Sequence, residues 1–437
     1  MKKNDTNLSR RGFLGGSAAV GSTVLLQSLA TGLPVSFLLN PNSVKAQDLN
    51  ANLQTLIFST SQAGDPVNVN CPGSYVNGVT NNPLLETSQS LFGEQRVRSA
   101  TPWAQLPRGL RRRLAFFHHR TDSAAHPEHD LTMSFRGAVK NVNGNGSEMF
   151  PSMVAQLGAS RMNTLQAEPM VLGRNRITYQ SQALQNIKPL ELKNLFANDE
   201  ATLSDLRGLR DRTLDRLYAD LKVSGSPIQR RFLDRFLLGR DQSRTLGNSI
   251  GTLLEGLSTD SDEGDDTRDQ IIAAVALAKL RVTPVIVLNI PFGRDNHQDE
   301  TLEMERDQTI SGTANLAFLW SELRRHNIHN DVSFAMLNVF GRRFNRNDRG
   351  GRDHNRHHSV MVAFGEKIKG GVYGGVNGNG QCRRINPNNG RPINNGGIAE
   401  GDTLGSAGKS LLAAMGHTRA EINERIRRGR VLNPFLV

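Results

Sequence analysis

The chain contains an uninterrupted apolar run at residues 283–290, Thr-Pro-Val-Ile-Val-Leu-Asn-Ile. A run of this kind, without alternation of apolar and polar residues, is typical of a strand buried on both faces in the middle of a parallel sheet. Similar short runs lie at 55–60, 114–117, 332–337 and 359–364. Because helical patterns alternate with these runs, we expect an α/β fold with a doubly wound, mostly parallel sheet and helices on both faces.

Helical patterns fill the intervals between the expected strands. The apolar face of the helix expected before the run at 332–337 consists of Leu316, Leu319, Trp320 and Leu323. Residues 190–280 repeat apolar side chains every three to four positions and predict a helical insert. Its segments lie at 204–217, 227–238 and 267–280. Residues 376–397 are rich in glycine and asparagine and predict a loop.

Histidines and carboxylates gather where the expected strands end. Eight of the eleven histidines lie in three such segments. These histidines are His118, His119, His126, His129, His297, His354, His357 and His358. Asp295 and Asp353 accompany two of the segments, and Asp65 follows the run at 55–60. Strand ends are where the sites of α/β proteins are built, so we expect these side chains to form a site at one edge of the sheet.

A mixed set of imidazoles and carboxylates suits Zn²⁺ or a similar divalent ion. Such an ion can activate a water molecule or polarise a phosphoryl or sulfuryl oxygen. The alternative is that these residues belong to surface loops and pair with the nearby arginines. Those arginines, among them Arg342 and Arg343, could instead clamp an anionic group, and the pattern supports both interpretations.

The N-terminus has the layout of an export signal. Residues 1–46 contain a basic head, the segment Arg10-Arg11-Gly-Phe-Leu14 and a small-residue cleavage site before Gln47. This resembles a twin-arginine signal and predicts delivery by the twin-arginine machinery to the periplasm or the exterior. A membrane anchor is the alternative, but glycine, serine and Pro34 dilute the apolar stretch. We therefore expect one domain at 47–437, with no stable membrane span after the signal is removed.

The balance of charge favours anionic partners. The formal net charge is +12, and residues 1–46 contain five basic residues and one acid, so their removal leaves +8. The basic segment 108–113 could suggest nucleic acid, but aromatic residues are sparse and no nucleic-acid-binding module is visible. We expect an anionic small molecule or an envelope polymer as the substrate, and no nucleic acid. Cys71 and Cys382 could form a disulfide in an oxidising compartment or remain thiols.

Four segments together resemble the exported family named domain of unknown function 1501, whose fold is related to alkaline phosphatases and sulfatases. They read Ala-Gly-Asp-Pro-Val-Asn at 63–68, Phe-Gly-Arg-Asp-Asn-His at 292–297, Val-Phe-Gly-Arg-Arg at 339–343 and Gly-Arg-Asp-His at 351–354. The last is followed by Lys-Gly-Gly-Val-Tyr-Gly at 369–374. The resemblance extends from about residue 53 to about residue 430.

The resemblance implies an alkaline-phosphatase-like fold with a divalent metal, for which zinc is the first candidate. The metal-binding positions that carry over are Asp65, Asp295, His297, Asp353 and His354. Arg342 would lie near the anion. Two features depart from the family pattern: Val339 occupies the place of a carboxylate, and His118-His119 occupies the place of the usual Arg-Ser. Thr121 or Ser123 would then have to supply the nucleophilic hydroxyl.

Two functions from different classes therefore fit the sequence. The first is a metal-dependent exported hydrolase of phosphate or sulfate esters, which the retained aspartates and histidines favour. The second is a non-catalytic relative that keeps the fold and binds envelope components or a partner. Val339 and His119 favour the second function, because both replace groups that catalysis would use.

Overall fold

The computed structural model describes most of residues 53–437. The residues outside the description are 1–52, 142, 143, 145, 160, 163, 165, 193–212, 214, 215, 221, 224, 226–229, 231–252, 255, 258–265 and 294. The chain divides into two compact units, one of residues 49–196 with 248–437 and one of 1–48 with 197–247. The expected signal at 1–46 lies outside the described residues, as do almost all of the helices expected at 204–217 and 227–238.

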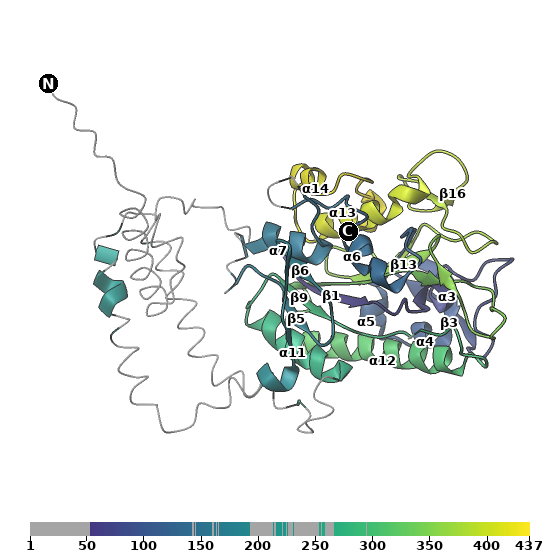
Figure 1. Cartoon of the computed structure of the whole chain (residues 1–437), viewed down its shortest axis with the longest axis horizontal. Helices are drawn as coiled ribbons and strands as arrows, with labels where there is room; N and C mark the ends of the chain where they lie inside the picture. Colours follow the sequence, from purple (N-terminus) through teal and green to yellow (C-terminus); the bar gives the residue numbers. More distant parts are fainter. Residues whose placement is uncertain are drawn as a thin grey trace, which may run out of the picture. The chain divides into compact units, whose positions relative to one another are not determined.

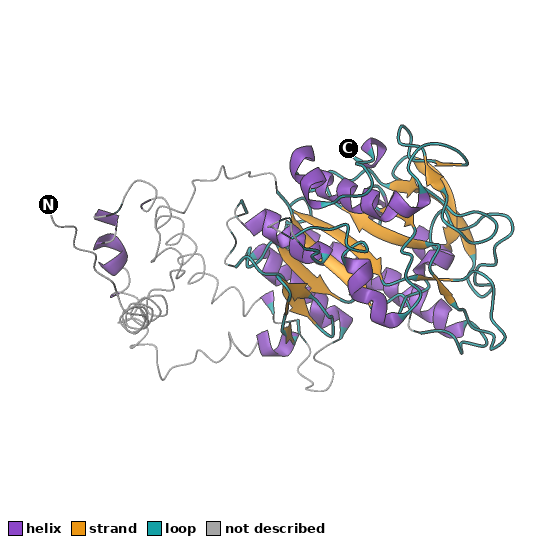
Figure 2. Ribbon diagram, turned by 45° about the horizontal axis from the view of Figure 1, so that its top comes forward, coloured by secondary structure: helices purple, strands orange, loops and turns teal. Residues whose placement is uncertain are grey.

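The larger unit is built around an eight-stranded sheet (Figure 2). Its strands, in spatial order, are β14 (Gly371–Tyr373), β4 (Ala115–His119), β13 (Ser359–Phe364), β10 (Val332–Asn338), β1 (Thr55–Ser61), β9 (Val285–Leu288), β5 (Met170–Leu172) and β8 (Asn186–Ile187). Neighbours are parallel except on the two sides of β13, so seven strands run one way and β13 runs the other. The mostly parallel sheet and all five expected strands are confirmed.

Helices cover both faces of this sheet (Figure 1). On one face lie α7 (Phe150–Ala159) and α13 (Thr403–Ala414), whose apolar residues join Leu56 and Phe58 of β1 in one core cluster. On the other lie α11 (Thr267–Lys279) and α12 (Glu303–Arg325). The apolar face expected for α12 is confirmed as buried. β1 and β10 are buried throughout, as two-sided coverage of a central apolar strand requires.

Short elements complete the larger unit. The helices are α3 (Val67–Asn70), α4 (Thr101–Ala104), α5 (Arg108–Arg111), η2 (His126–Glu128), α6 (His129–Met133), η3 (Glu400–Asp402), α14 (Arg419–Arg425) and η4 (Asn433–Phe435). The two-stranded ribbons are β2 (Thr87–Phe92) with β3 (Gln95–Ala100), β6 (Thr178–Tyr179) with β7 (Gln182–Ala183), β11 (Gly341–Arg342) with β12 (His354–Asn355), and β15 (Arg384–Ile385) with β16 (Pro392–Ile393). Apart from β15 and β16, residues 376–397 form the expected loop.

The direction of the strands brings distant loops to one edge. β1, β4, β9 and β10 run in the same direction, so the segments that follow them begin at the same edge of the sheet. The antiparallel pairing of β11 with β12 then places Arg342 opposite His354. Among the described residues, no helix is both long enough and apolar enough to cross a membrane.

Candidate metal centre

Three imidazoles and one carboxylate converge at this edge. The ligand atoms of His126, Asp295 and His354 all lie within 4.8 Å of one another. The Nε2 atom of His297 lies 2.8 Å from Nε2 of His354 and 3.6 Å from Oδ1 of Asp295. His126 comes from the segment after β4, Asp295 and His297 from the segment after β9, and His354 from β12. The strand ends thus assemble one group from three separate parts of the sequence.

The far nitrogen of each imidazole contacts an oxygen acceptor. Nδ1 lies 2.6 Å from the Gln62 carbonyl oxygen in His126 and 2.5 Å from the Ala124 carbonyl oxygen in His354. In His297, Nδ1 lies 3.2 Å from Oδ1 of Asp353. These oxygens only accept, so each Nδ1 carries the proton, and in the neutral ring each Nε2 presents its lone pair.

The three lone pairs point into the group rather than toward hydrogen-bond donors. Burial lowers the pKa of His354 to about 4, so this ring is neutral near pH 7. Two neutral Nε2 atoms at 2.8 Å repel each other unless a cation or a proton lies between them. Histidines that bind metals show the same arrangement, with the second ring nitrogen donating to a carbonyl or carboxylate.

The spacing of the group fits a small divalent ion. Bonds of 2.0–2.1 Å in a tetrahedron place neighbouring ligand atoms about 3.3 Å apart. Nε2 of His126 lies 3.5 Å from Oδ2 of Asp295, and Nε2 of His297 lies 3.6 Å from Oδ1 of the same carboxylate. These two separations are near the tetrahedral spacing, whereas the Nε2 atoms of His297 and His354 lie closer, at 2.8 Å, and the ligand atoms of His126, Asp295 and His354 lie within 4.8 Å of one another. The residues present therefore fit zinc or a similar ion once small side-chain movements equalise these distances.

Asp353 lies behind His297 and orients its ring. The Asp353 carboxylate accepts from Nδ2 of Asn347 at 3.0 Å as well as from His297. Asn347, and after it His297, lower the pKa of Asp353 below its usual value. Asp353 thus orients the His297 ring, and its role as a metal ligand stays a prediction.

Asp65 occupies a buried position outside the converging group. Its Oδ2 accepts from the backbone N–H of Phe292 at 2.8 Å, while its Oδ1 has no partner among the described residues. Burial raises the pKa of the Asp65 carboxyl to about 6. Its role as a metal ligand stays a prediction.

Arg342 is fully buried, and backbone oxygens engage its guanidinium. It donates to the carbonyl oxygens of Gly64 and Ala63, both at 2.6 Å, and Nη1 lies 3.3 Å from Oδ1 of Asp295. Burial lowers the pKa of Arg342. Burial also opposes ionisation of Asp295, but Arg342 and His297 outweigh it and lower the pKa of Asp295. Arg342 thereby fixes the Asp295 carboxylate against the loop after β1.

The candidate nucleophiles are buried side chains. Thr121 and Ser123 are 1% and 0% exposed, and Oγ of Ser123 lies 2.7 Å from Oγ1 of Thr132. Val339 is buried, and its carbonyl oxygen accepts from the same Thr132 hydroxyl. Both ring nitrogens of His119 lack a partner among the described residues, and burial lowers its pKa to about 3. The nucleophilic role of Thr121 or Ser123 stays a prediction.

A buried ion pair ties together the loops that carry the group. Arg352 and Glu305 are both fully buried, with Nε to Oε2 at 2.6 Å and Nη2 to Oε1 at 3.2 Å. The Glu305 carboxylate also accepts from Nδ2 of Asn296 at 3.0 Å and from Nδ2 of Asn70 at 2.8 Å. Arg352 precedes Asp353, and Asn296 lies between Asp295 and His297. The network thus joins α12 to the two loops that contain Asp295, His297 and Asp353.

His126 is the member of the group that sequence reasoning did not select as a ligand. It lay in the histidine-rich segment after β4, but nothing in the sequence distinguished it from His118, His119 and His129. The structure separates them. His118 bonds His358 at 2.9 Å within the core, whereas His126 packs against the His354 ring with centroids 4.8 Å apart.

Both cysteines are buried free thiols. Burial raises the pKa of Cys71 far above its usual value and that of Cys382 to about 12.

A pocket of about 640 Å³ lies beside the group, with Asp295, His297, Asn347, Arg349 and Asp353 in its lining.

Residues 252–391 match the model of a family described as "Protein of unknown function (DUF1501)". The match contains Asp295, His297 and His354 but does not extend to His126. It covers less than half of the chain, and the resemblance expected from about residue 53 to about residue 430 is confirmed within the matched residues. No curated protein matches the chain.

Proposed function

We propose that this protein binds one divalent ion of the zinc class through His126, Asp295, His297 and His354. The observation that supports this most strongly is the shared protonation pattern of the three imidazoles. Each Nδ1 contacts an oxygen acceptor. Nε2 of His126 and Nε2 of His297 lie 3.5 Å and 3.6 Å from the Asp295 carboxylate, and Nε2 of His354 lies 2.8 Å from Nε2 of His297. Three independent hydrogen bonds that all free the inward nitrogen favour a common cation as their cause.

We further propose that the protein is an exported hydrolase of phosphate or sulfate esters. A bound ion of this kind would supply Lewis acidity and lower the pKa of a coordinated water. The chain's own residues would orient the site: Asp353 holds the His297 ring, and Arg342 holds the Asp295 carboxylate. Arg349, which lines the adjacent pocket together with Asp348, offers a cation to an anionic ester. The basic composition and the segment around Arg10-Arg11 support an anionic substrate and export.

A non-catalytic metal protein is the second candidate, and one feature favours it. Four protein ligands close a tetrahedral site, as in structural zinc centres, whereas catalytic centres keep one position for water. The burial of Thr121 and Ser123 points the same way. The two candidates share the metal and differ in turnover.

Metal analysis of protein purified without chelator tests the shared claim. We expect about one zinc, manganese or iron per wild-type chain, a large loss in the His354→Ala variant, and retention in the His357→Ala variant. His357 is the matched control, because it lies three residues from His354 but outside the converging group. Equal, substoichiometric metal in all three proteins would contradict the metal centre.

Turnover distinguishes the two candidates. The hydrolase predicts release of phosphate or sulfate from an aryl ester between pH 6 and 10, with loss of activity in His354→Ala. A metal-loaded protein without turnover of either ester would favour the non-catalytic candidate. Export is tested by replacing Arg10 and Arg11 with lysine, which should leave the precursor inside a bacterium that has the twin-arginine machinery.

A further inference from the structure

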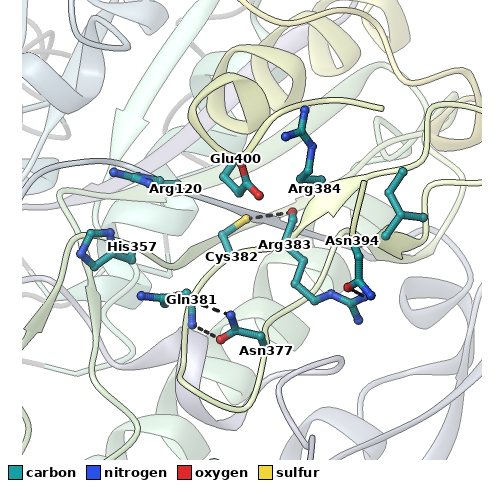
Figure 3. A pocket seen from close by; sticks show the side chains of 10 residues that line it. Arg120, His357, Asn377, Gln381, Cys382, Arg383, Arg384, Asn394 and Glu400 are labelled. Carbon is teal, nitrogen blue, oxygen red and sulfur yellow. Dashed lines mark hydrogen bonds between the residues drawn. The ribbon is translucent and has the colours of Figure 1, made fainter. Parts of the chain in front are cut away.

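Three adjoining pockets lead away from the candidate metal centre. The first is the pocket of about 640 Å³ that contains Asp295 and His297 in its lining. A second, of about 370 Å³, shares Asp353 with the first. A third, also of about 370 Å³, shares His357 and Gln381 with the second (Figure 3). Consecutive pockets share wall residues and therefore adjoin, and we call the three together the arginine groove.

The arginine groove is cationic beyond the metal centre. The second and third pockets contain Arg343, Arg346, Arg120, Arg383 and Arg384. Their only acids in the described lining are Asp353 and Glu400, and Asp353 already accepts from His297. Arg120 is paired with Asp122, which lies outside both linings. The groove therefore offers more positive than negative charge to a ligand that occupies it.

The remaining polar lining supplies amides. Figure 3 shows Asn377, Gln381 and Asn394 around the third pocket, and Asn345 and Asn355 line the second. Amides both donate and accept, as recognition of sugar hydroxyls requires. Burial, with Arg120 and Arg356 adding to it, lowers the pKa of His357, so this ring joins as a neutral partner near pH 7.

Hydrogen bonds hold the far wall in place relative to the metal centre. Nδ2 of Asn355 donates to the Gly380 carbonyl at 2.9 Å, and the Cys382 backbone N–H donates to the His357 carbonyl at 2.9 Å. Asn355 belongs to β12, directly after the candidate ligand His354. A ligand that spans the groove would therefore meet a wall positioned before binding.

We propose that the arginine groove binds a linear anionic polysaccharide that carries sulfate or phosphate groups and leads one ester to the metal centre. This assignment rests on the proposed hydrolase function and specifies its substrate as a polymer. The lining favours a polysaccharide over a single-stranded nucleic acid, because nucleic-acid grooves use aromatic side chains on which bases stack. Among the described residues that line the groove, the one phenylalanine is Phe344, which is 3% exposed, and tryptophan and tyrosine are absent.

Binding of heparin-derived fragments of two, four and eight sugars to the metal-loaded mature protein tests the proposal. We expect the affinity to rise at least about tenfold from the disaccharide to the octasaccharide as further pockets are occupied. The desulfated octasaccharide should bind weakly. The double variant Arg383→Gln with Arg384→Gln should lose about tenfold in octasaccharide affinity, with metal content and disaccharide affinity unchanged.

Two further variants complete the design. Arg343→Gln replaces an exposed arginine of the second pocket and should also lower the affinity for the octasaccharide. This single variant keeps the proposal testable if the double variant does not fold. Arg108→Gln with Arg112→Gln is the matched control, because it removes two exposed charges outside the groove and should leave the affinity unchanged.

The outcomes separate the groove from the metal centre. Two results in a metal-loaded, active protein would overturn the groove proposal alone. One is an affinity that does not change with fragment length, and the other is an equal loss of affinity in the control variant and the groove variant. The protein could instead bind no metal but still bind the fragments with an affinity that rises with length and falls in the groove variants. This result would support the groove as a binding site and refute the proposed function. Tighter binding of a single-stranded oligonucleotide of equal charge would overturn the assignment to polysaccharide.

Discussion

Replacement of Glu305 by glutamine tests whether the buried network supports the candidate site. Glutamine keeps the size of the side chain but removes the charge that faces Arg352 in a fully buried position. The Arg352 guanidinium would then keep only neutral acceptors: the amide oxygen of the new glutamine and backbone carbonyls, among them Thr80 at 3.2 Å and Phe344. It would become a buried cation without a counter-ion.

The size of the effect follows from this burial. Removal of one partner from a buried ion pair costs about 3–5 kcal/mol, because the remaining charge stays desolvated. For a unit of this size that corresponds to a fall of about 5 °C in Tm. Glu305 also accepts from Asn296, so the variant should loosen the loop of Asp295 and His297 and weaken metal binding.

Thermal unfolding of the metal-free protein, followed by circular dichroism, measures the first effect. Glu303→Gln is the matched control. Glu303 is exposed and lies two residues before Glu305 on the same helix, so its replacement should leave Tm unchanged. The double variant Glu305→Leu with Arg352→Met removes both charges and should be more stable than Glu305→Gln. A Tm for Glu305→Gln within about 1 °C of wild type would show that the buried ion pair does not stabilise the larger unit as expected.

Three further changes have defined outcomes. Asp353→Asn should weaken zinc binding about 10- to 100-fold in a chelator competition, because the amide no longer fixes the proton of His297, and unchanged affinity would contradict that role. Burial lowers the pKa of His417 to about 4, so folding favours the neutral ring and this contribution to stability is lost as pH falls from about 6.5 toward 4. The free energy of unfolding of His417→Gln, measured in urea, should therefore fall less on acidification than that of wild type, by up to about 3 kcal/mol at pH 4. An equal fall in both proteins would refute this. Gly64→Ala should lower Tm, because φ is +67° and the added Cβ would overlap the Phe340 ring, and an unchanged Tm would show that the ring moves aside without cost.

Much of the fold was predictable because its central strands are buried on both faces. The runs at 55–60 and 332–337 became β1 and β10, and every residue of both strands is buried. The reversed direction of β13 was not predictable from the sequence. A short buried strand has the same apolar pattern in a parallel and an antiparallel pair, and direction depends on the path of the chain between strands.

The location of the candidate site was more predictable than the set of residues that form it. Asp295, His297 and His354 were expected at strand ends, and the segment after β9 and strand β12 bring them together. His126 was not selected, because its contacts with the Gln62 carbonyl and the His354 ring depend on tertiary structure. Arg342 was expected beside an anion, and only its burial shows that its donors are used within the protein.

Anomalous diffraction from crystals of the zinc-loaded protein tests the central claim most directly. We expect one strong peak within about 2.0–2.2 Å of Nε2 of His126, His297 and His354 and of a carboxylate oxygen of Asp295. We also expect this peak to disappear or weaken strongly in the His126→Ala variant. A peak elsewhere, or no peak among these four side chains at full zinc loading, would contradict the metal centre.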